Sequence, residues 1–194
     1  DMVPQPAAGS SLHPMLINAG RSALLIVDVQ ERLMPAVAGA DAVVRNCARL
    51  MRAAARLDVP ILVSEQNPKG LGATLGELAE LAPPEAVVRK MHFSCSADAE
   101  YARRFAALGR DQAIIAGIEA HVCVLQTALG FRRAGQECFV VADAAASRSP
   151  DDKAWALARL QGDGVAIVTT EMVLFEWLEK AGTAEFKELS RLVK

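Results

Sequence analysis

The chain has 194 residues, of which 52% are hydrophobic and 23% charged, a composition that excludes a disordered protein. Its formal net charge of -2 and its lack of a Lys/Arg block predict a small-molecule or protein partner, with no nucleic acid and no membrane surface. The four cysteines form no CxxC pair, a pattern typical of reduced thiols in a cytoplasmic protein.

The N-terminal residues 1–20 are expected to form a partly flexible arm, because Pro, Ala, Gly and Ser dominate the first fourteen. They show neither the basic nor the apolar part of a targeting signal. Residues 21–194 are expected to form one domain. Apolar and β-branched runs in it predict six strands, at residues 23–29, 61–65, 86–89, 112–116, 137–142 and 165–168.

Helical spacing predicts helices between these strands and after the last one, at residues 36–57, 75–81, 98–108, 122–134, 151–160, 171–179 and 184–192. The polar QNPKGLG run at residues 66–72 is expected to be a loop. Strands that alternate with helices predict an α/β fold with a six-stranded, mainly parallel sheet, covered on both faces in three α/β/α layers.

Polar side chains stand where three predicted strands give way to loops. Asp28 lies at the end of the first strand, Lys90 ends the third, and Cys123 follows the fourth near a helix N-terminus. The carboxyl ends of parallel strands share one rim of the sheet, where open α/β sheets bind ligands. We expect Lys90 to lower the pKa of the Cys123 thiol, and Asp28 to accept its proton and return it to a leaving group.

Simpler interpretations compete with this one. A cysteine at a helix start is most often a buried structural thiol, and Asp28 with Lys90 makes a plausible structural salt bridge. A less favoured alternative, since its HxxC and HxC spacings are not established zinc-ligand patterns, is a metal site built from His92, Cys95, His121 and Cys123.

Taken together, the motifs resemble the isochorismatase-like cysteine hydrolase superfamily, which includes nicotinamidases and carbamoylsarcosine hydrolases. The resemblance rests on LLIVDVQERL with Asp28, VVRKMHFSC with Lys90 and AGIEAHVCVLQTA with Cys123. DAAASR at residues 143–148 and GVAIVTTEMVLFEWL at residues 164–178 extend it over residues 23–178. The SEQNPKGLG segment looks most like the isochorismatase-domain-containing branch of unassigned function.

The resemblance implies a catalytic triad in which Cys123 is the nucleophile, Asp28 the proton acceptor and donor, and Lys90 the electrostatic support. It also implies a cis peptide bond between Ile118 and Glu119, with the N–H groups of Glu119 and Cys123 forming an oxyanion hole. The implied reaction is attack on an amide-like or related acyl C–N bond of a small molecule, followed by hydrolysis of a thioester.

Departures from the family pattern narrow this expectation. Nicotinamidases bind a metal through an Asp-x-His pair and a further histidine after the second strand, where this chain has Ser64, Glu65, Gln66 and Asn67. We therefore expect a metal-independent enzyme with no cofactor. Isochorismatases that cleave a vinyl ether lack the nucleophilic thiol, so the presence of Cys123 argues against that activity.

Three further residues are expected to line a substrate pocket. Gln30 follows Asp28 at the side-chain period of a strand, Phe93 offers an apolar wall, and His121 lies at the pocket mouth. Asp143 and Arg148 are expected to form a structural pair.

Two other classes of function remain open: a non-catalytic binding or scaffold protein, and a redox sensor that uses the Cys123 thiol. A homo-oligomer, either a dimer or a tetramer, is also expected. The superfamily commonly pairs subunits, and LFEWLEKAG at residues 174–182 has an apolar character suited to a contact. Trp155 and Trp177 are expected to serve packing or subunit contact.

Overall fold

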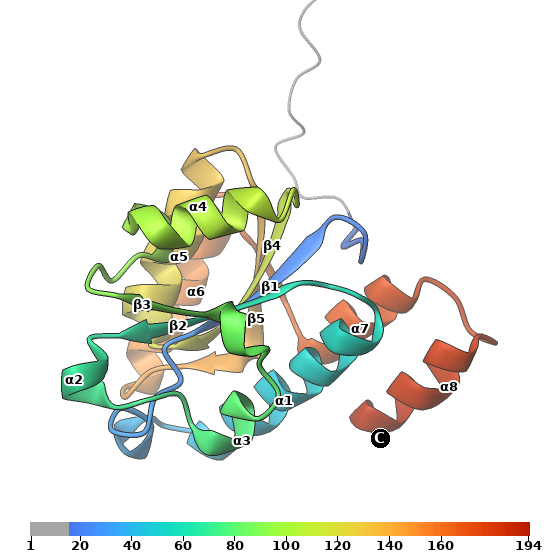
Figure 1. Cartoon of the computed structure of the whole chain (residues 1–194), viewed down its shortest axis with the longest axis horizontal. Coiled ribbons are helices and arrows are strands. Elements are labelled where there is room, and N and C mark those ends of the chain that lie inside the picture. Colours follow the sequence, from blue (N-terminus) through green and yellow to red (C-terminus); the bar gives the residue numbers. More distant parts are fainter. Residues whose placement is uncertain (1–15) are drawn as a thin grey trace, which may run out of the picture.

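The sheet has six strands in the order β3-β2-β1-β4-β5-β6 (Figure 1). The computed structural model describes residues 16–194, so most of the predicted N-terminal arm lies outside the described residues. Every neighbouring pair is parallel, which confirms the predicted α/β fold. The strands are β1 Ser22–Val27, β2 Ile61–Gln66, β3 Val87–Lys90, β4 Gln112–Ile118, β5 Glu137–Ala146 and β6 Ala166–Val168.

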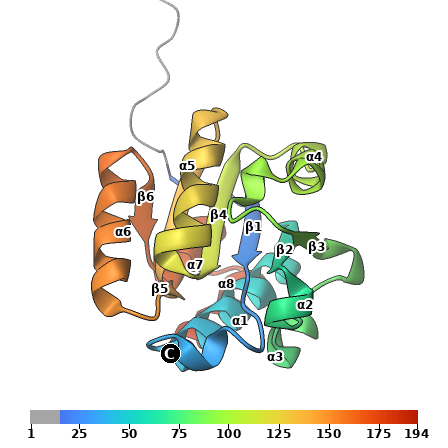
Figure 2. The ribbon, with the colours of Figure 1, turned by 90° about the vertical axis from the view of Figure 1, so that its left-hand side faces the viewer.

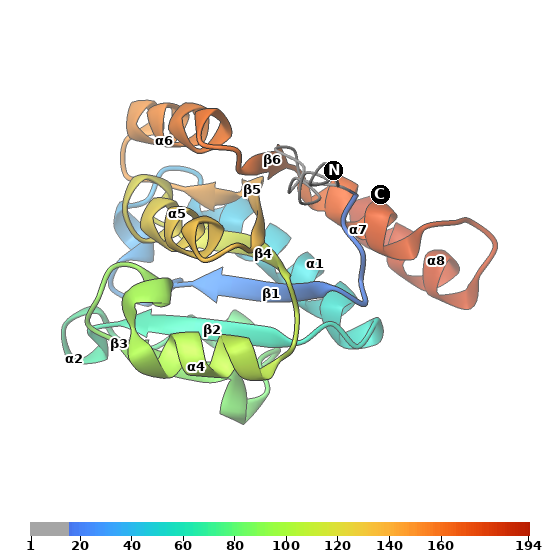
Figure 3. The same cartoon turned by 90° about the horizontal axis from the view of Figure 1, so that it is seen from above.

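Helices cover both faces of this sheet. One face carries α4, α5 and α6, and the other carries α1 and α7 (Figures 2 and 3). The helices are α1 Ala40–Arg56, α2 Pro68–Leu71, α3 Gly76–Ala79, α4 Ala99–Ala107, α5 Leu125–Arg133, α6 Pro150–Gly162, α7 Thr170–Leu178 and α8 Ala184–Leu189. A single π-helical turn, Ala120–Val124, connects β4 to α5.

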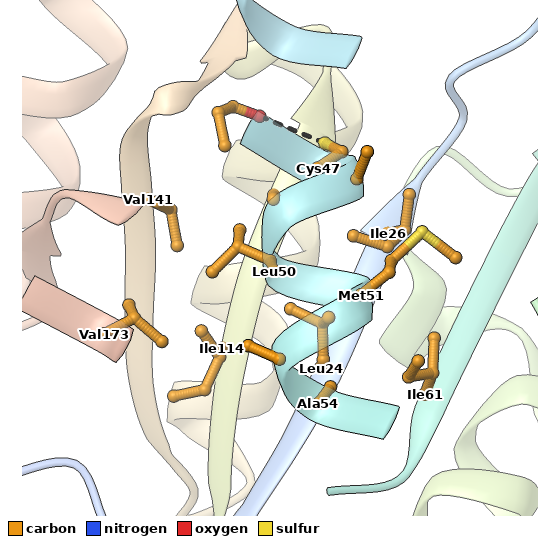
Figure 4. Packing of buried hydrophobic residues seen from close by; sticks show 14 of the residues in the cluster. Leu24, Ile26, Cys47, Leu50, Met51, Ala54, Ile61, Ile114, Val141 and Val173 are labelled. Carbon is orange, nitrogen blue, oxygen red and sulfur yellow. Dashed lines mark hydrogen bonds between the residues drawn. The ribbon is translucent and has the colours of Figure 1, made fainter. Parts of the chain in front are cut away.

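The core is divided in two by the sheet, as the alternation along β1 shows. Leu24 and Ile26 pack with α1 on one side, whereas Leu25 and Val27 pack with α4 and α5 on the other. Figure 4 shows the first layer, in which the Cys47 thiol of α1 donates to the carbonyl oxygen of Ala144 in β5 at 3.7 Å. Because all six residues of β1 are buried, the carboxyl end of this strand is fixed in place.

Several elements differ from the predictions at their ends. The fourth strand was expected to stop before Gly117, but β4 continues to Ile118. Gly117 has φ +119°, and a Cβ there would lie 2.1 Å from the carbonyl oxygen of Val27 in β1. Glycine therefore permits a close approach of two strands where a break was predicted. The first helix begins only at Ala40, after Gly39 at φ +74°, and the expected loop at residues 66–72 contains the short helix α2.

The segment at residues 174–182 is not the exposed apolar surface that we expected. Leu174, Trp177 and Leu178 are buried within the fold, and the indole Nε1 of Trp177 donates to the hydroxyl of Ser22 at 2.9 Å. Phe175 is partly exposed, and Trp155 on α6 projects largely into solvent. Among residues 16–194, no helix is both long and apolar enough to cross a membrane.

Candidate active site

Asp28 and Lys90 meet at the carboxyl end of the sheet. Asp28 follows β1 directly, and Lys90 is the last residue of β3. The Lys90 ammonium donates to Asp28 Oδ2 at 2.9 Å, and both side chains are completely buried. Asp28 has φ +53°, a left-handed conformation that is uncommon outside glycine and is enriched at functional sites.

The Lys90 ammonium is enclosed by oxygen atoms. Besides Asp28, it donates to Oε1 of Gln66 at 2.9 Å and to the carbonyl oxygens of His92 and Phe93 at 3.0 Å each. Burying an unpaired ammonium would cost several kcal/mol, so these partners are what permits a lysine at this depth. The lysine also fixes the loop that carries His92 and Phe93.

The Asp28 carboxylate is surrounded by donors. Its Oδ1 accepts from the hydroxyl of Ser64 in β2 at 2.7 Å, its Oδ2 accepts from Lys90, and its negative charge raises the pKa of the nearby Cys123 thiol. The order of strands reverses between β1 and β4, and ligands of open α/β sheets bind at such a switch point. The predicted carboxylate, ammonium and thiol therefore converge on one place.

The pKa of the Cys123 thiol is raised above its ordinary value, which favours the protonated form. Burial is the largest factor that raises its pKa, the negative charge of Asp28 is the second, and the positive charge of Lys90 only partly opposes them. Lys90 lowers the pKa of Cys123 as expected, but the expected net lowering was wrong, because Cys123 is only 6% exposed and the charge of Asp28 also raises its pKa. A thiol with a raised pKa can act as a nucleophile only with the help of a base.

The turn that carries Cys123 has an unusual backbone. The peptide bond between Ile118 and Glu119 is cis. The amides of Val122 and Val124 both donate to the carbonyl oxygen of Glu119, at 3.1 and 3.2 Å. The amide of Cys123 lies between these two and does not share that acceptor.

The three predicted pocket residues differ in their surroundings. Gln30 is completely buried, and its amide group bonds to the backbone N–H and carbonyl of Gln66 and to the carbonyl of Gly72. The prediction that Gln30 faces a substrate was wrong: β1 ends at Val27, so the strand period does not extend to residue 30. Phe93 is 52% exposed, in the loop whose carbonyl oxygens accept from Lys90.

His121 lies on the nucleophile turn, which we define as residues 119–124. Its Nδ1 is 2.8 Å from the hydroxyl oxygen of Ser147, and its Nε2 is 3.8 Å from a carboxylate oxygen of Asp152. It is partly exposed. No group of three metal-binding side chains comes together anywhere in residues 16–194, which includes the four residues of the zinc alternative.

Asp143 and Arg148 do not pair with each other. Asp143 accepts from the backbone N–H and the hydroxyl of Thr170, at 2.7 and 2.9 Å. Arg148 instead donates to the carboxylate of Glu119. The prediction failed because β5 continues past Asp143 to Ala146, which places the two side chains against different elements.

Sequence reasoning missed Ser64 and Gln66 as members of the site. They occupy alternate positions of β2, so their side chains lie on the same side of the strand. One donates to Asp28 and the other accepts from Lys90. The signal in the sequence was the run of polar residues Ser64, Glu65 and Gln66 that ends the apolar second strand.

The sequence as a whole is similar to known proteins. The family model for the isochorismatase domain matches residues 22–172. Isochorismatase domain-containing protein 2 from Danio rerio is 39% identical over 173 residues, which are 89% of this chain and 86% of that protein.

Two solved structures share the fold. The structure titled MAR1 ribonuclease from Caenorhabditis elegans is 32% identical, with a TM-score of 0.86 and 92% of each chain covered. The octameric YcaC hydrolase of unknown specificity from Escherichia coli is 22% identical, with a TM-score of 0.86, and covers 97% of this chain and 92% of its own. On the match to the family model and the identity to the Danio rerio protein, the chain belongs to the isochorismatase family.

Proposed function

We propose that this protein is a metal-independent cysteine hydrolase that acts on an amide-like or related acyl C–N bond of a small molecule. The observation that carries the proposal is the buried Asp28 carboxylate, which Lys90 and Ser64 hold in place and whose charge raises the pKa of the Cys123 thiol near it. A thiol beside an oriented base is the arrangement that nucleophilic catalysis needs. Family membership supports a hydrolase.

The reaction proceeds in two halves. Asp28 accepts the thiol proton as the sulfur of Cys123 attacks the acyl carbon, and the amides of Glu119 and Cys123 donate to the oxygen that becomes negative. Asp28 then gives its proton to the departing nitrogen, which leaves a thioester on Cys123. In the second half, Asp28 takes a proton from water, the hydroxide adds to the thioester, and the thiol leaves and regains its proton from Asp28.

Lys90 acts as an electrostatic support in both halves. Its ammonium lies 2.9 Å from Asp28 Oδ2 and holds the carboxylate in place through each proton transfer, and its charge lowers the pKa of the Cys123 thiol. Ser64 and Gln66 occupy the end of β2, and their side chains are engaged with Asp28 and Lys90. These bonds support a reaction without a metal, because the side chains at this strand end hold Asp28 and Lys90.

The two other classes of function make different demands. A redox sensor needs a thiol with a lowered pKa, whereas the pKa of Cys123 is raised. A scaffold would have no use for the contact of Cys123 with Asp28. The nematode relative carries the name ribonuclease, but the net charge of -2 gives no basis for attracting RNA, so we propose a small-molecule substrate and no nucleic-acid partner.

A substrate panel tests the proposal. We expect the wild-type protein to hydrolyse at least one member of a panel of amides, ureido compounds and nitriles, with single-stranded RNA included as a further candidate. Cys123→Ala and Asp28→Asn should abolish hydrolysis, whereas the matched control Asp143→Asn, another strand carboxylate, should retain it. Intact-protein mass spectrometry should detect the acyl adduct on Cys123. Hydrolysis that persists in Cys123→Ala would overturn the mechanism.

We also propose a cytoplasmic homo-oligomer. The four cysteines are free thiols, as in a reducing compartment. Leu16, Met172 and Phe175 are exposed and line one surface cavity of about 750 Å³, next to which a second subunit would bury apolar area. Light scattering at micromolar concentration should report a dimer or tetramer, and a monomeric mass would contradict this.

A further inference from the structure

The nucleophile turn is tied to the segment after β5 by a carboxylate that the proposed mechanism does not use. The side chain of Glu119 is only 8% exposed. It accepts the backbone N–H of Arg148 at 2.9 Å and the guanidinium Nε of the same residue at 3.1 and 3.2 Å. The backbone carbonyl of Glu119 accepts the two amides of the turn described above. Glu119 therefore links the hydrogen bonds within the turn to the segment that follows β5.

A second contact runs in parallel with the first. His121 Nδ1 lies 2.8 Å from the hydroxyl oxygen of Ser147, and its ring is also 4.0 Å from the Glu119 carboxylate. Ser147 is buried, and its carbonyl oxygen accepts the amide of Ala38 at 3.1 Å. The segment to which the turn is attached is thus itself attached to the chain that follows β1. The anchor is part of the fold and not a loose loop.

The geometry of the turn explains why it needs an anchor. A π-helical turn holds one residue more than an α-helical turn, and such turns are rare except at functional sites. If the turn relaxed to continue α5 as an α-helix, each residue would rotate by about 100° around the axis. The side chain of Cys123 would then face a different direction. An external restraint on the first residue of the turn opposes that relaxation.

We propose that Glu119 and Arg148 form a clamp that holds the nucleophile turn in its π-helical form and so keeps the Cys123 sulfur against Asp28. Both are positioning residues, and their role rests on the proposed function only in so far as the thiol is the nucleophile. Arg148 is the better residue to change, because its side chain is 63% exposed and its backbone N–H survives any substitution.

The clamp predicts opposite effects on two measurements. In Arg148→Ala the sulfur moves away from the Asp28 charge that raises its pKa, so iodoacetamide should alkylate Cys123 faster, by about fivefold or more at pH 8. Turnover of any substrate found should fall about 10- to 100-fold in kcat with little change in KM, since misplacing a reacting group by about 1 Å has effects of this size. Arg148→Lys should restore part of both. A partly unfolded protein would not combine faster alkylation of Cys123 with a lower kcat, a nearly unchanged KM and partial rescue by Arg148→Lys.

The matched control is Arg103→Ala. Arg103 also pairs with a glutamate, Glu100, and is 68% exposed, but it lies on α4 and has no contact with the turn. Its alkylation profile between pH 6 and 10 should superimpose on that of the wild type. Glu119→Gln, which keeps the backbone of the turn and a neutral acceptor, should act like Arg148→Ala but more weakly.

Alkylation needs no substrate, so this result stands apart from the proposed function. If no compound is hydrolysed but Arg148→Ala still speeds alkylation of Cys123, the proposed function fails and the clamp is supported. If hydrolysis is found but the Arg148→Ala profile superimposes on the wild type or is slower, in a protein with an unchanged circular dichroism spectrum, the clamp is overturned.

Discussion

Replacing Asp28 by asparagine should make Cys123 a poorer catalyst and a more reactive thiol at the same time. The substitution keeps the shape of the side chain and removes the charge that raises the pKa of the thiol. Lys90 then faces the sulfur without its counterion, which favours the thiolate further. Hydrolysis should stop because no base remains within reach of the thiol.

The size of the effect follows from the contact. Two unit charges about 4 Å apart interact by about 4 kcal/mol at an effective dielectric constant of about 20. Because a factor of ten corresponds to about 1.4 kcal/mol, even half of this energy gives more than tenfold more thiolate at neutral pH. A thiolate of lower pKa is intrinsically less nucleophilic, so we expect the observed alkylation rate at pH 7.5 to rise by about five- to twentyfold.

The assay is alkylation by iodoacetamide between pH 6 and 10, followed at Cys123 by peptide mass spectrometry. The other three thiols provide an internal reference, because burial raises the pKa of Cys95 to about 11 and those of Cys47 and Cys138 to about 12. The wild-type rate at Cys123 should still be rising at pH 10.

A companion variant should change the rate in the other direction. Lys90→Gln removes the one charge that lowers the pKa of Cys123, so alkylation should become slower than in the wild type. Both variants break a buried ion pair and should lose about 3–5 kcal/mol of stability, which circular dichroism and thermal melting will show. A folded Asp28→Asn protein whose Cys123 reacts no faster than the wild type would refute the reasoning.

Three further predictions concern stability. Gly117→Ala should lose about 3 kcal/mol or more in urea unfolding, because its Cβ would strike the backbone of β1, whereas Gly39→Ala, also at positive φ but with nothing within 4 Å, should lose only about 1–2 kcal/mol. Above pH 9 the unfolded chain releases thiol protons that the folded chain keeps, so the unfolding free energy should fall between pH 9 and 11, and Cys138→Ala should reduce that slope by about 1.4 kcal/mol per pH unit. Trp177→Phe should lose about 1 kcal/mol in the same unfolding assay, through the missing bond to Ser22 and the hydroxyl left behind; a stability equal to the wild type would contradict that bond.

The sheet and the meeting of Asp28 with Lys90 could be predicted because each depends on local pattern. A buried apolar strand followed directly by a charged residue places that residue at the carboxyl rim, whatever the neighbouring strands are. Asp28 and Lys90 are of this kind, since each stands at or next to the last residue of its strand. Gly117 shows the limit of this rule. The glycine was interpreted as a strand end, but it is needed because the backbone of β1 passes too close for a side chain.

The partners of these residues could not be predicted, because they are set by register and by exact strand length. Asp143 and Arg148 lie only five positions apart, yet one bonds to Thr170 and the other to Glu119 once β5 extends to Ala146. Gln30 was misplaced for a related reason: the left-handed backbone at Asp28 ends the strand and cancels the alternation that the prediction used. The positive φ of Asp28 therefore decides which way the chain after β1 runs.

The protonated state of Cys123 links the structure to selectivity. A permanent thiolate would react with any electrophile or oxidant that reached it, whereas a thiol held by a carboxylate becomes nucleophilic only as its proton moves. After burial, the charge of Asp28 is the largest factor that raises the pKa of the thiol. In the proposed mechanism Asp28 also accepts the proton, so the residue that suppresses reactivity at rest would be the one that releases it during attack. Lys90 limits the suppression, because its charge lowers the pKa of the thiol. The proposed mechanism therefore ties reaction at Cys123 to a substrate whose acyl carbon is placed for attack while its leaving nitrogen can take the proton back.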